Sequence, residues 1–466
     1  MTIASDSGAR HAAAVATLRA SYDAIPPGQP VRLAKRTSNL FRPRTDQPVA
    51  GLDVSGLDDV ISVDPASRTA DVQGMCTYER LVDATLPYGL MPLVVPQLKT
   101  ITLGGAVTGL GIEASSFRNG LPHESVLEMD VLTGDGRLVT CSPQENAELF
   151  STFPNSYGSL GYTVRLKIEL ERTHPYVGLH HVRFRDLDDA CAAIEEIVES
   201  RSWHGEDVDF LDGVTFGPDE TYLTLGRWLD DVRSGGQGRP SKYTGQQIYY
   251  RSLRERSHDV LTVRDYLWRW DTDWFWCSRA FGAQNRWLRR VWPTAYRRSD
   301  FYHRLVGLEH RYGLAAKIDR LRGHPARERV VQDVEIPVER TADFLRWFDA
   351  HVPMTPVWLC PLKLRDRDGA AREWPLYPLK AGQTYVNIGF WGTVPIEAGR
   401  SDGDVNRMIE ESVAEHDGHK SLYSDAYYSR EEFDALYGGE TYRKVKELYD
   451  PQARLTGMYE KAVGRR

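Results

Sequence analysis

The sequence has no long apolar run, few cysteines and no excess of positive charge. No apolar stretch reaches the roughly 20 residues of a membrane span, and the alanine-rich stretch near the start is too short for a signal peptide. We therefore expect a cytoplasmic protein. The five cysteines are scattered, without a CxxC pair or a His/Cys cluster at zinc spacing, which indicates a reducing compartment and no metal site. A net charge of -7 argues against a nucleic-acid partner.

One local basic run contrasts with this acidic balance. It consists of Arg286, Arg289, Arg290, Arg297 and Arg298. A solvated helix face is the more ordinary interpretation of such a run. A patch for phosphate or for an anionic membrane surface is the alternative, and it leaves open peripheral contact with the inner face of the cell membrane.

The first third of the chain is patterned as strands and turns. With 466 residues and 41% hydrophobic composition, the chain is long enough for more than one core. Patterning predicts helices at 8–22, 77–87 and 144–153, hairpins at 60–73 and 126–142, and an alternating strand at 164–170. These elements indicate an α+β domain built on mixed or antiparallel sheets.

A change in composition near residue 185 predicts a second α+β domain. Its expected elements are a helix at 187–200, a glycine-rich loop at 230–247, an aromatic block at 266–281, strands at 330–334, 357–364 and 385–390, and a helix at 341–350. From about residue 405 the pattern is helical again. We therefore divide the chain into 1–185, 186–404 and 405–466.

The densest chemical signal is the glycine-rich segment at 100–120. Glycine lets the backbone approach a ligand closely and offers N–H groups to phosphate oxygens, so a dinucleotide pyrophosphate is the expected guest. Residues 109–114 also match the GxGxx(G/A) pattern of a Rossmann site, but Asn119, Gly120 and Pro122 leave no room for the long helix such a site requires. We reject the Rossmann interpretation.

Two other segments have the same character. Residues 33–42 place Arg36, Thr37, Ser38 and Asn39 after a short strand, where they can donate hydrogen bonds to a pyrophosphate. Residues 154–170 hold a Gly-x-x-Gly turn that leads into a strand. The three segments in this order are more specific than any one of them.

In these segments the sequence resembles the vanillyl-alcohol-oxidase-type FAD-binding superfamily. That resemblance implies a two-lobed FAD-binding domain at 1–185, a substrate domain at 186–404 and a C-terminal segment, with a closing helix at 437–451, that returns to the FAD lobe. Residues 35–42, 102–121, 357–362 and 421–433 are further similar to the 24-dehydrocholesterol reductase family. Its actinobacterial relatives include flavin reductases of 10-methylstearic (tuberculostearic) acid synthesis.

The resemblance implies a set of FAD-binding residues. They are Arg36, Thr37, Ser38, Asn39, Thr102, Leu103, Gly104, Gly105, Gly109, Gly111, Ser115, Ser116, Gly158, Ser159, Leu160, Gly161 and Tyr162. The first loop has no His or Cys, so we expect non-covalent FAD, with Cys76 and His123 as the residues that would contradict this. NADPH is the implied electron donor.

The resemblance also implies an activity, namely the saturation of an isolated double bond on a lipid. The implied conversion is 10-methylene-stearoyl to 10-methylstearoyl in a phospholipid, after an S-adenosylmethionine-dependent methyltransferase has made the alkene. A sterol side-chain reductase, an oxygen-using FAD oxidase of alcohols and a lipid-binding protein that has kept a flavin fold are the alternatives.

Reduction of an isolated alkene requires a proton donor in a dry pocket. The resemblance places residues 419–428 near the flavin, so Tyr427, Tyr428 and His419 are candidate acids. Asp273 is a fourth candidate, although Asp271 and Asp273 are more simply explained as partners of Arg269 and Arg279. The aromatic candidates for the substrate pocket are Tyr250, Trp270, Trp274 and Trp276, for which core packing is an equal explanation.

Overall fold

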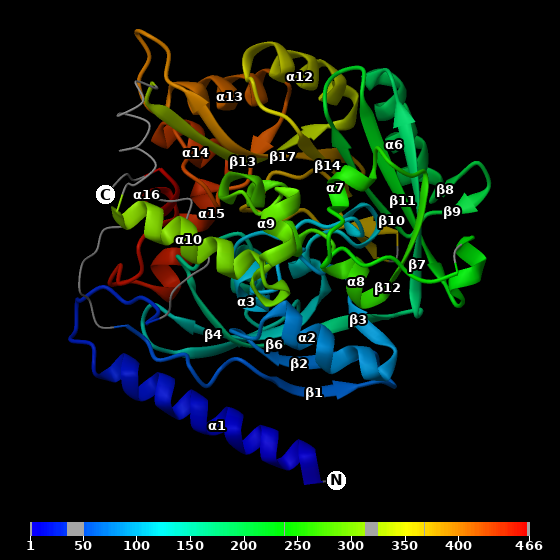
Figure 1. Ribbon diagram of the computed structural model, residues 1–466. Coiled ribbons are helices and arrows are strands. Elements are labelled where there is room, and N and C mark those ends of the chain that lie inside the picture. Colours follow the sequence, from blue (N-terminus) through cyan, green and yellow to red (C-terminus); the bar gives the residue numbers. More distant parts are fainter. Residues whose placement is uncertain (1, 35–50, 237, 313–324, 368, 464–466) are drawn as a thin grey trace.

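The computed structural model describes residues 2–34, 51–236, 238–312, 325–367 and 369–463. Helices and antiparallel sheets are mixed along this part of the chain, which confirms the α+β prediction (Figure 1). No helix within these ranges is both long and apolar enough to cross a membrane.

The first sheet is antiparallel and has the order β1-β2-β6-β4-β5, with β3 paired to β6. Its strands are β1 Val60–Asp64, β2 Thr69–Gln73, β3 Leu90–Pro92, β4 Val126–Thr133, β5 Leu138–Cys141 and β6 Gly161–Arg172. Both predicted hairpins are confirmed by the β1–β2 and β4–β5 pairings. Gly136 closes the second turn with a φ of 86°, in the region that favours glycine.

The second sheet has eight antiparallel strands in the order β12-β7-β11-β10-β14-β17-β13-β18. The strands are β7 Tyr176–Phe184, β10 Phe210–Thr215, β11 Thr221–Leu229, β12 His258–Thr262, β13 Arg327–Pro337, β14 Val357–Lys363, β17 Thr384–Pro395 and β18 His419–Lys420. β7 lies before the boundary expected at residue 185, yet it pairs within this second sheet.

Three helices cover one face of the second sheet: α6 Leu187–Ser200, α12 Val338–His351 and α13 Asp404–Glu415 (Figure 1). α6 coincides with its predicted range. Asp186 caps its first turn, and its apolar residues recur every three or four positions and are buried. Val330, Val334 and Ile336 on β13 pack in one core with these three helices. Side chains alternate between the two faces of a strand, so Asp333 and Glu335 face the opposite side of the sheet.

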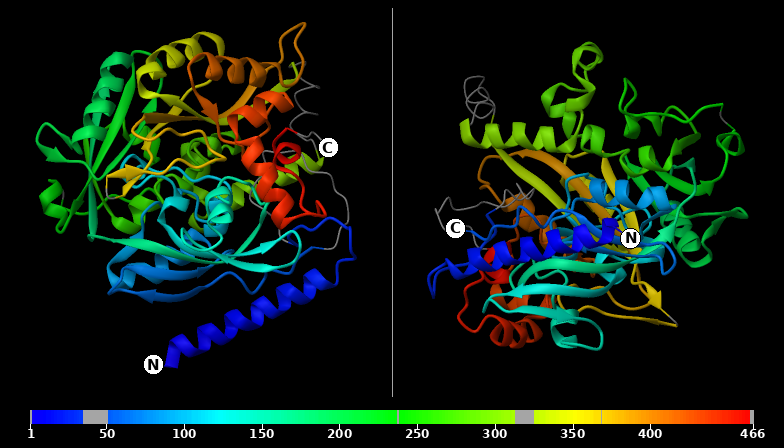
Figure 2. Two further views of the ribbon diagram at one scale, coloured as in Figure 1. Left: turned by 180° about the vertical axis from the view of Figure 1, so that it is seen from behind. Right: turned by 90° about the horizontal axis from the view of Figure 1, so that it is seen from below.

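The C-terminal helices return to the first sheet (Figure 2). They are α14 Arg430–Leu436, α15 Gly439–Tyr449 and α16 Met458–Ala462. α15 packs on α5 Ala147–Thr152. Arg454 donates to the Tyr22 hydroxyl at the end of α1, Thr2–Asp23, and to the backbone carbonyls of Ile25 and Gln29. The first and last parts of the chain thus share one core.

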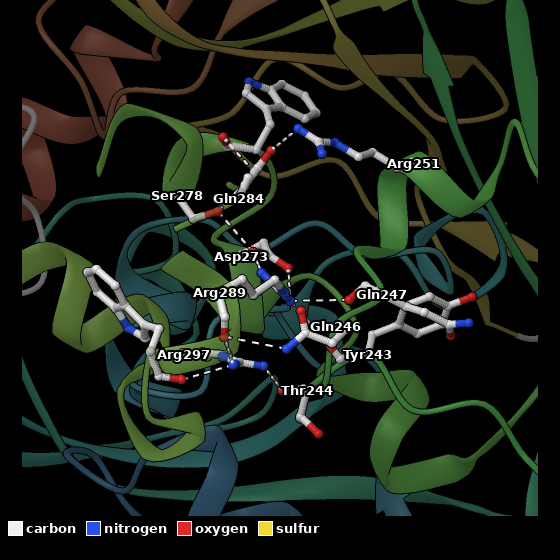
Figure 3. A network of polar contacts seen from close by, with 12 residues as sticks. Tyr243, Thr244, Gln246, Gln247, Arg251, Asp273, Ser278, Gln284, Arg289 and Arg297 are labelled. Carbon is white, nitrogen blue, oxygen red and sulfur yellow. Dashed lines mark hydrogen bonds and ion pairs between the residues drawn. The ribbon is translucent and has the colours of Figure 1, made fainter. Parts of the chain in front are cut away.

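The arginine run lies on α9 Arg286–Val291 and the turns after it, and its members differ in environment. Arg289 and Arg297 are buried, and Figure 3 shows their guanidinium groups directed at backbone carbonyls and at Asp273. Arg298 pairs with Glu79 at 2.8 Å. A fully solvated helix face was the wrong interpretation, because only Arg286 and Arg290 are exposed.

Candidate active site

The glycine-rich segment packs closely on the first sheet. Thr102 caps the N-terminus of α3 (Leu103–Thr108), and its hydroxyl accepts from Gly105 N. Gly104 N donates to Gly74 O at 2.9 Å. A Cβ at Gly104 would lie 2.2 Å from Thr163 Oγ1 on β6. Only glycine therefore lets α3 approach the sheet this closely.

The loop before β6 closes on the other end of α3. Asn155 Nδ2 donates to Gly109 O at 2.6 Å, and Tyr157 N donates to Thr108 O. Asn155 and Tyr157 have φ values of 60° and 53°, in the left-handed region that costs free energy for residues other than glycine. Backbone strain of this kind is concentrated at ligand sites.

The C-terminal segment meets this loop. Leu422 N donates to the Tyr157 hydroxyl at 2.9 Å, and Lys461 Nζ donates to the carbonyl of Gly158 at 2.8 Å. Lys446 Nζ on α15 donates to Ser159 O at 2.7 Å. Two of the three predicted cofactor segments are therefore brought together, with residues near 422 against them.

The other predicted cofactor residues lie in different environments. Arg36, Thr37, Ser38 and Asn39 lie outside the described residues. The hydroxyls of Ser115, Ser116 and Ser159 bond to backbone groups of Leu93, Glu113 and Ser156 respectively. Leu103 and Leu160 are core residues, Tyr162 packs beneath Lys461, and Gly111 and Gly161 lie too close to their neighbours to accept a Cβ.

Segment 112–119 does not continue into a long helix. α4 (Ser116–Asn119) is a single turn that ends at Gly120, where φ is 68°. This confirms the rejection of a Rossmann site. α4 packs against β14, and Ala114 O accepts from Leu211 N on β10. The end of the glycine-rich segment is thus inserted between two strands of the second sheet.

A buried acid cluster occupies the face of the second sheet opposite the covering helices. Asp333 is half-buried, with its Oδ1 shielded from solvent, and its carboxyl is hydrogen-bonded by the Tyr423 hydroxyl, which accepts from Trp391 Nε1 at 2.8 Å. Asp333 Oδ1 and both polar atoms of Asn387 have no hydrogen-bond partner among the described residues. Burial raises the pKa of Asp333 to about 7. Near neutral pH this carboxyl therefore holds a proton much of the time.

Glu335 lies two residues further along β13 on the same face. Its Oε1 accepts from the Ser421 hydroxyl at 2.8 Å, while Oε2 lies 3.7 Å from His419 Nε2. Burial raises the pKa of Glu335 to about 8 and lowers the pKa of His419 to about 3. Around pH 7 both groups are mainly neutral, so the pair holds its proton on the carboxyl.

A second buried cluster joins the glycine-rich segment to the second sheet. Arg269 Nη2 lies 3.1 Å from Glu113 Oε1 and 2.8 Å from Asp212 Oδ2, with its guanidinium carbon 4.0 Å from the Tyr266 ring centroid. Trp270 Nε1 also donates to Asp212. Burial raises the pKa of Glu113 to about 7 despite the nearby guanidinium. This cluster ties residue 113 to the aromatic block.

The aromatic block packs on the acid-bearing face. Phe275 lies between the Trp270 ring, 4.9 Å away, and the Trp391 ring on β17, 4.4 Å away. Trp276 donates to Trp391 O and packs on the same ring. These contacts make an aromatic wall next to Asp333, because a Cβ at Gly389 would touch both Asp333 and Trp391.

The four predicted pocket residues are all buried. Trp270 and Trp276 belong to the aromatic wall. The Tyr250 ring packs against Trp276 at 6.2 Å, and its hydroxyl donates to Gln284 Oε1. Trp274 packs instead on His303 of α10, Ser299–Tyr312. Two of the four are thus placed beside the acid cluster.

The four predicted acids are also dispersed. Tyr427 packs on Gly403 and Arg407 at the start of α13, and Tyr428 lies among the C-terminal helices against Tyr437. Asp273 makes a bidentate ion pair with Arg289 at 2.6 and 3.0 Å. The pairing predicted with Arg269 and Arg279 is wrong for this residue. Of the four, His419 lies beside the acid cluster.

Asp271 also lacks the predicted arginine partner. It accepts from Lys99 N and from the Ser299 hydroxyl. The two residues proposed as sites of covalent attachment are enclosed: Cys76 is fully buried, and His123 packs on the Trp374 ring with its pKa lowered by burial to about 3.

Asp333, Glu335 and Asn387 were missed by the sequence reasoning. The available signal was Val330 to Ile336, an apolar strand in which two carboxylates occupy alternate positions on one face. Such a pattern is ordinarily typical of a strand with one face in water. Tyr423 was considered within 421–433 but was not selected.

The chain is similar in sequence to known proteins along most of its length. A family model described as an FAD binding domain matches residues 10–142. The human Delta(24)-sterol reductase is 26% identical over 420 residues, covering 87% of this chain and 76% of that protein. The Arabidopsis thaliana Delta(24)-sterol reductase is 23% identical over 440 residues, covering 88% and 76%. Cytokinin dehydrogenase 10 of rice (Oryza sativa subsp. japonica) is 30% identical over 143 residues, covering 31% and 26%.

The chain is therefore an enzyme, an FAD-binding oxidoreductase. Its relatives along most of its length are named Delta(24)-sterol reductases. The described residues fit FAD: α3, the strained loop at 155–158 and the residues near 422 converge, and buried Asn155 Oδ1 and Thr163 Oγ1 beside them have no hydrogen-bond partner in the described ranges.

Proposed function

We propose that the protein uses NADPH and non-covalent FAD to saturate an isolated carbon–carbon double bond on a lipid. The observation that carries this proposal is Asp333, a half-buried carboxyl whose shielded Oδ1 faces an aromatic wall and whose pKa is raised to near neutrality. An isolated alkene accepts hydride poorly because no carbonyl stabilises the resulting carbanion. A proton must be delivered early, and a buried neutral acid is suited to that task.

The chain's own residues have distinct tasks in this reaction. When bound and reduced, FAD would supply a hydride for one alkene carbon. Asp333, oriented by Tyr423, holds the proton for the other carbon at Oδ1. The rings of Phe275, Trp358 and Trp391 exclude water and stabilise transient positive charge on the more substituted carbon, by ~0.5–2 kcal/mol each.

The proposed substrate is a 10-methylene-stearoyl chain in a phospholipid, which becomes 10-methylstearoyl. Support comes from the resemblance of residues 102–121 and 421–433 to flavin reductases of this pathway. An S-adenosylmethionine-dependent methyltransferase would supply the alkene, and the cytoplasm is the proposed compartment. A sterol side chain is the second candidate, favoured by the similarity to Delta(24)-sterol reductases along 87% of the chain.

Anaerobic mixing of the holoenzyme tests the proposal. NADPH should bleach the flavin absorbance, and 10-methylene phospholipid should restore it with formation of the 10-methyl lipid, followed by mass spectrometry. Restoration by a Δ24 sterol alone would transfer the activity to the second candidate. Bleaching by an alcohol and not by NADPH would indicate an oxidase and contradict the reductase proposal.

The pKa of Asp333 predicts how the rate depends on pH. The proton-holding form of Asp333 is the active one, and its population falls as pH rises through about 7. We expect the rate of flavin reoxidation by substrate to fall about tenfold per pH unit above that value. Single-turnover stopped-flow measurements from pH 6 to 9 would record it. A rate that stays flat or rises over this range would contradict proton donation by Asp333.

A further inference from the structure

Large apolar side chains are exposed together on and just after α9. Trp287, Leu288, Val291 and Tyr296 are 68%, 48%, 76% and 50% exposed. Trp287 and Leu288 are four and three positions before Val291, so the three share one face of the helix. Among the described residues only Tyr88 and Leu448 are comparable, and each stands alone. We refer to these four residues with Arg286 and Arg290 as the α9 patch.

The α9 patch is basic as well as apolar. Arg286 and Arg290 are exposed, and neither has a carboxylate within ion-pair distance in the described part of the chain. Arg286 lies 5.4 Å from the Trp287 ring centroid. The whole chain carries a net charge of -7, so this local positive charge runs against its overall balance.

The buried arginines of the same run hold the α9 patch in place. Arg289 binds Asp273 and donates to the carbonyls of Gly245 and Gln247, at 2.9 and 3.1 Å (Figure 3). Arg297 donates to Thr244 O at 2.8 Å and to Trp292 O at 2.9 Å. The exposed side chains therefore project from a backbone that is already ordered, which lowers the entropic cost of binding.

We propose that the α9 patch docks the protein on an anionic lipid bilayer. Tryptophan and tyrosine favour the boundary between acyl chains and headgroups, and arginines beside them favour anionic headgroups. In Figure 1 α9 and α10 lie in front of both sheets, and the view from below in Figure 2 shows this part of the chain at the edge of the molecule. The proposal rests on exposure and charge, and it holds whichever alkene the enzyme reduces.

The α9 patch follows directly in the chain on the segment that contributes to the aromatic wall. Gln284, just before α9, donates to Trp276 O and to the Ser278 hydroxyl. A bilayer on the α9 patch would therefore lie against the segment that also contributes Phe275 and Trp276 to the site.

Co-flotation of the holoenzyme with vesicles tests docking. We expect binding to vesicles of equal parts phosphatidylglycerol and phosphatidylcholine, and much weaker binding to phosphatidylcholine alone. The double variant Arg286→Gln/Arg290→Gln should lose about 10- to 30-fold in partitioning to the anionic vesicles, and added salt should weaken the unmodified enzyme similarly. Trp287→Ser/Val291→Ser should lose at least tenfold on both vesicle types.

The matched control is Tyr88→Ser/Leu448→Ser, which removes two exposed apolar side chains elsewhere and should bind as the unmodified enzyme does. Equal binding by all variants, or no binding to anionic vesicles, would overturn the proposal. Light scattering supplies a further outcome: if Trp287→Ser/Val291→Ser changes the mass of the protein in solution and leaves vesicle binding intact, the α9 patch is a self-association surface and lipid docking is wrong.

Discussion

Replacing Asp333 with asparagine should lower the rate of flavin reoxidation by substrate by about 100-fold or more, the usual contribution of a positioned proton donor. Asparagine has the same shape and can still accept from the Tyr423 hydroxyl, but it cannot hold the transferable proton. FAD content and the rate of reduction by NADPH should remain unchanged. Stopped-flow absorbance of the flavin measures both half-reactions separately.

Stability separates loss of the acid from loss of the fold. The pKa of Asp333 in the folded protein, about 7, lies above the ordinary aspartate value of 3.8. Between pH 3.8 and about 7 the folded protein therefore binds more protons than the unfolded chain. The contribution of Asp333 to the free energy of unfolding consequently falls as pH rises through this range. Asp333→Asn should be at least as stable as the unmodified enzyme at pH 8.

Two controls complete the design. Asp343→Asn changes an exposed carboxylate on α12, on the covered face of the sheet, and should leave both half-reactions intact. Tyr423→Phe should slow reoxidation less than Asp333→Asn, because it removes the orienting hydroxyl and keeps the acid. A normal reoxidation rate in Asp333→Asn would assign the proton to another group, with Glu335 next along the strand.

The secondary structure could be predicted from the sequence because its signals are local. α6 needs only the Asp186 cap and apolar residues at helical spacing, and the β4–β5 hairpin needs only its glycine turn. The rejection of a Rossmann site succeeded for the same reason, since Gly120 sits next to the turn it ends.

The proton-donor candidates were harder to predict because burial is decided at long range. Asp333 and Glu335 alternate with apolar residues as a water-facing edge would, but their carboxyl groups are shielded because residues 421–423 pack on them and Phe275 packs on the neighbouring Trp391. Tyr423 and Tyr427 are equally plausible in sequence. One contacts Trp391 and the other packs on Gly403, a difference set by the path of an irregular segment.

The arginine run illustrates the same limit. Arg289 and Arg290 are adjacent and chemically identical, yet one is buried against Asp273 and the other is exposed. Helical geometry places neighbours about 100° apart, so a run of one residue type cannot present one environment. Which member turns inward depends on the carbonyls at 244–247, some 40 residues earlier in the chain.

Replacing Arg269 with methionine should destabilise the protein by about 3–5 kcal/mol, the usual consequence of removing one partner from a buried ion cluster. Methionine can fill the volume of the arginine stem, but Glu113 and Asp212 would remain buried without a cation. Calorimetric Tm, with flavin content measured in parallel, would record the loss. The matched control is Arg264→Met, which breaks an exposed pair with Asp83 and should cost about 1 kcal/mol or less.

The deficit of Arg269→Met should also depend on pH in a defined direction. Burial already raises the pKa of Glu113 to about 7, and without the guanidinium this carboxyl would bind its proton more tightly. The folded variant then binds more protons than the unfolded chain, so its stability falls as pH rises above 4.5. We expect a smaller deficit at pH 5 than at pH 8.

The triple variant Glu113→Gln/Asp212→Asn/Arg269→Met should recover much of the lost stability, because no buried charge remains. A deficit equal to that of Arg264→Met, or one that does not change with pH, would mean that the cluster does not hold the glycine-rich segment to the second sheet.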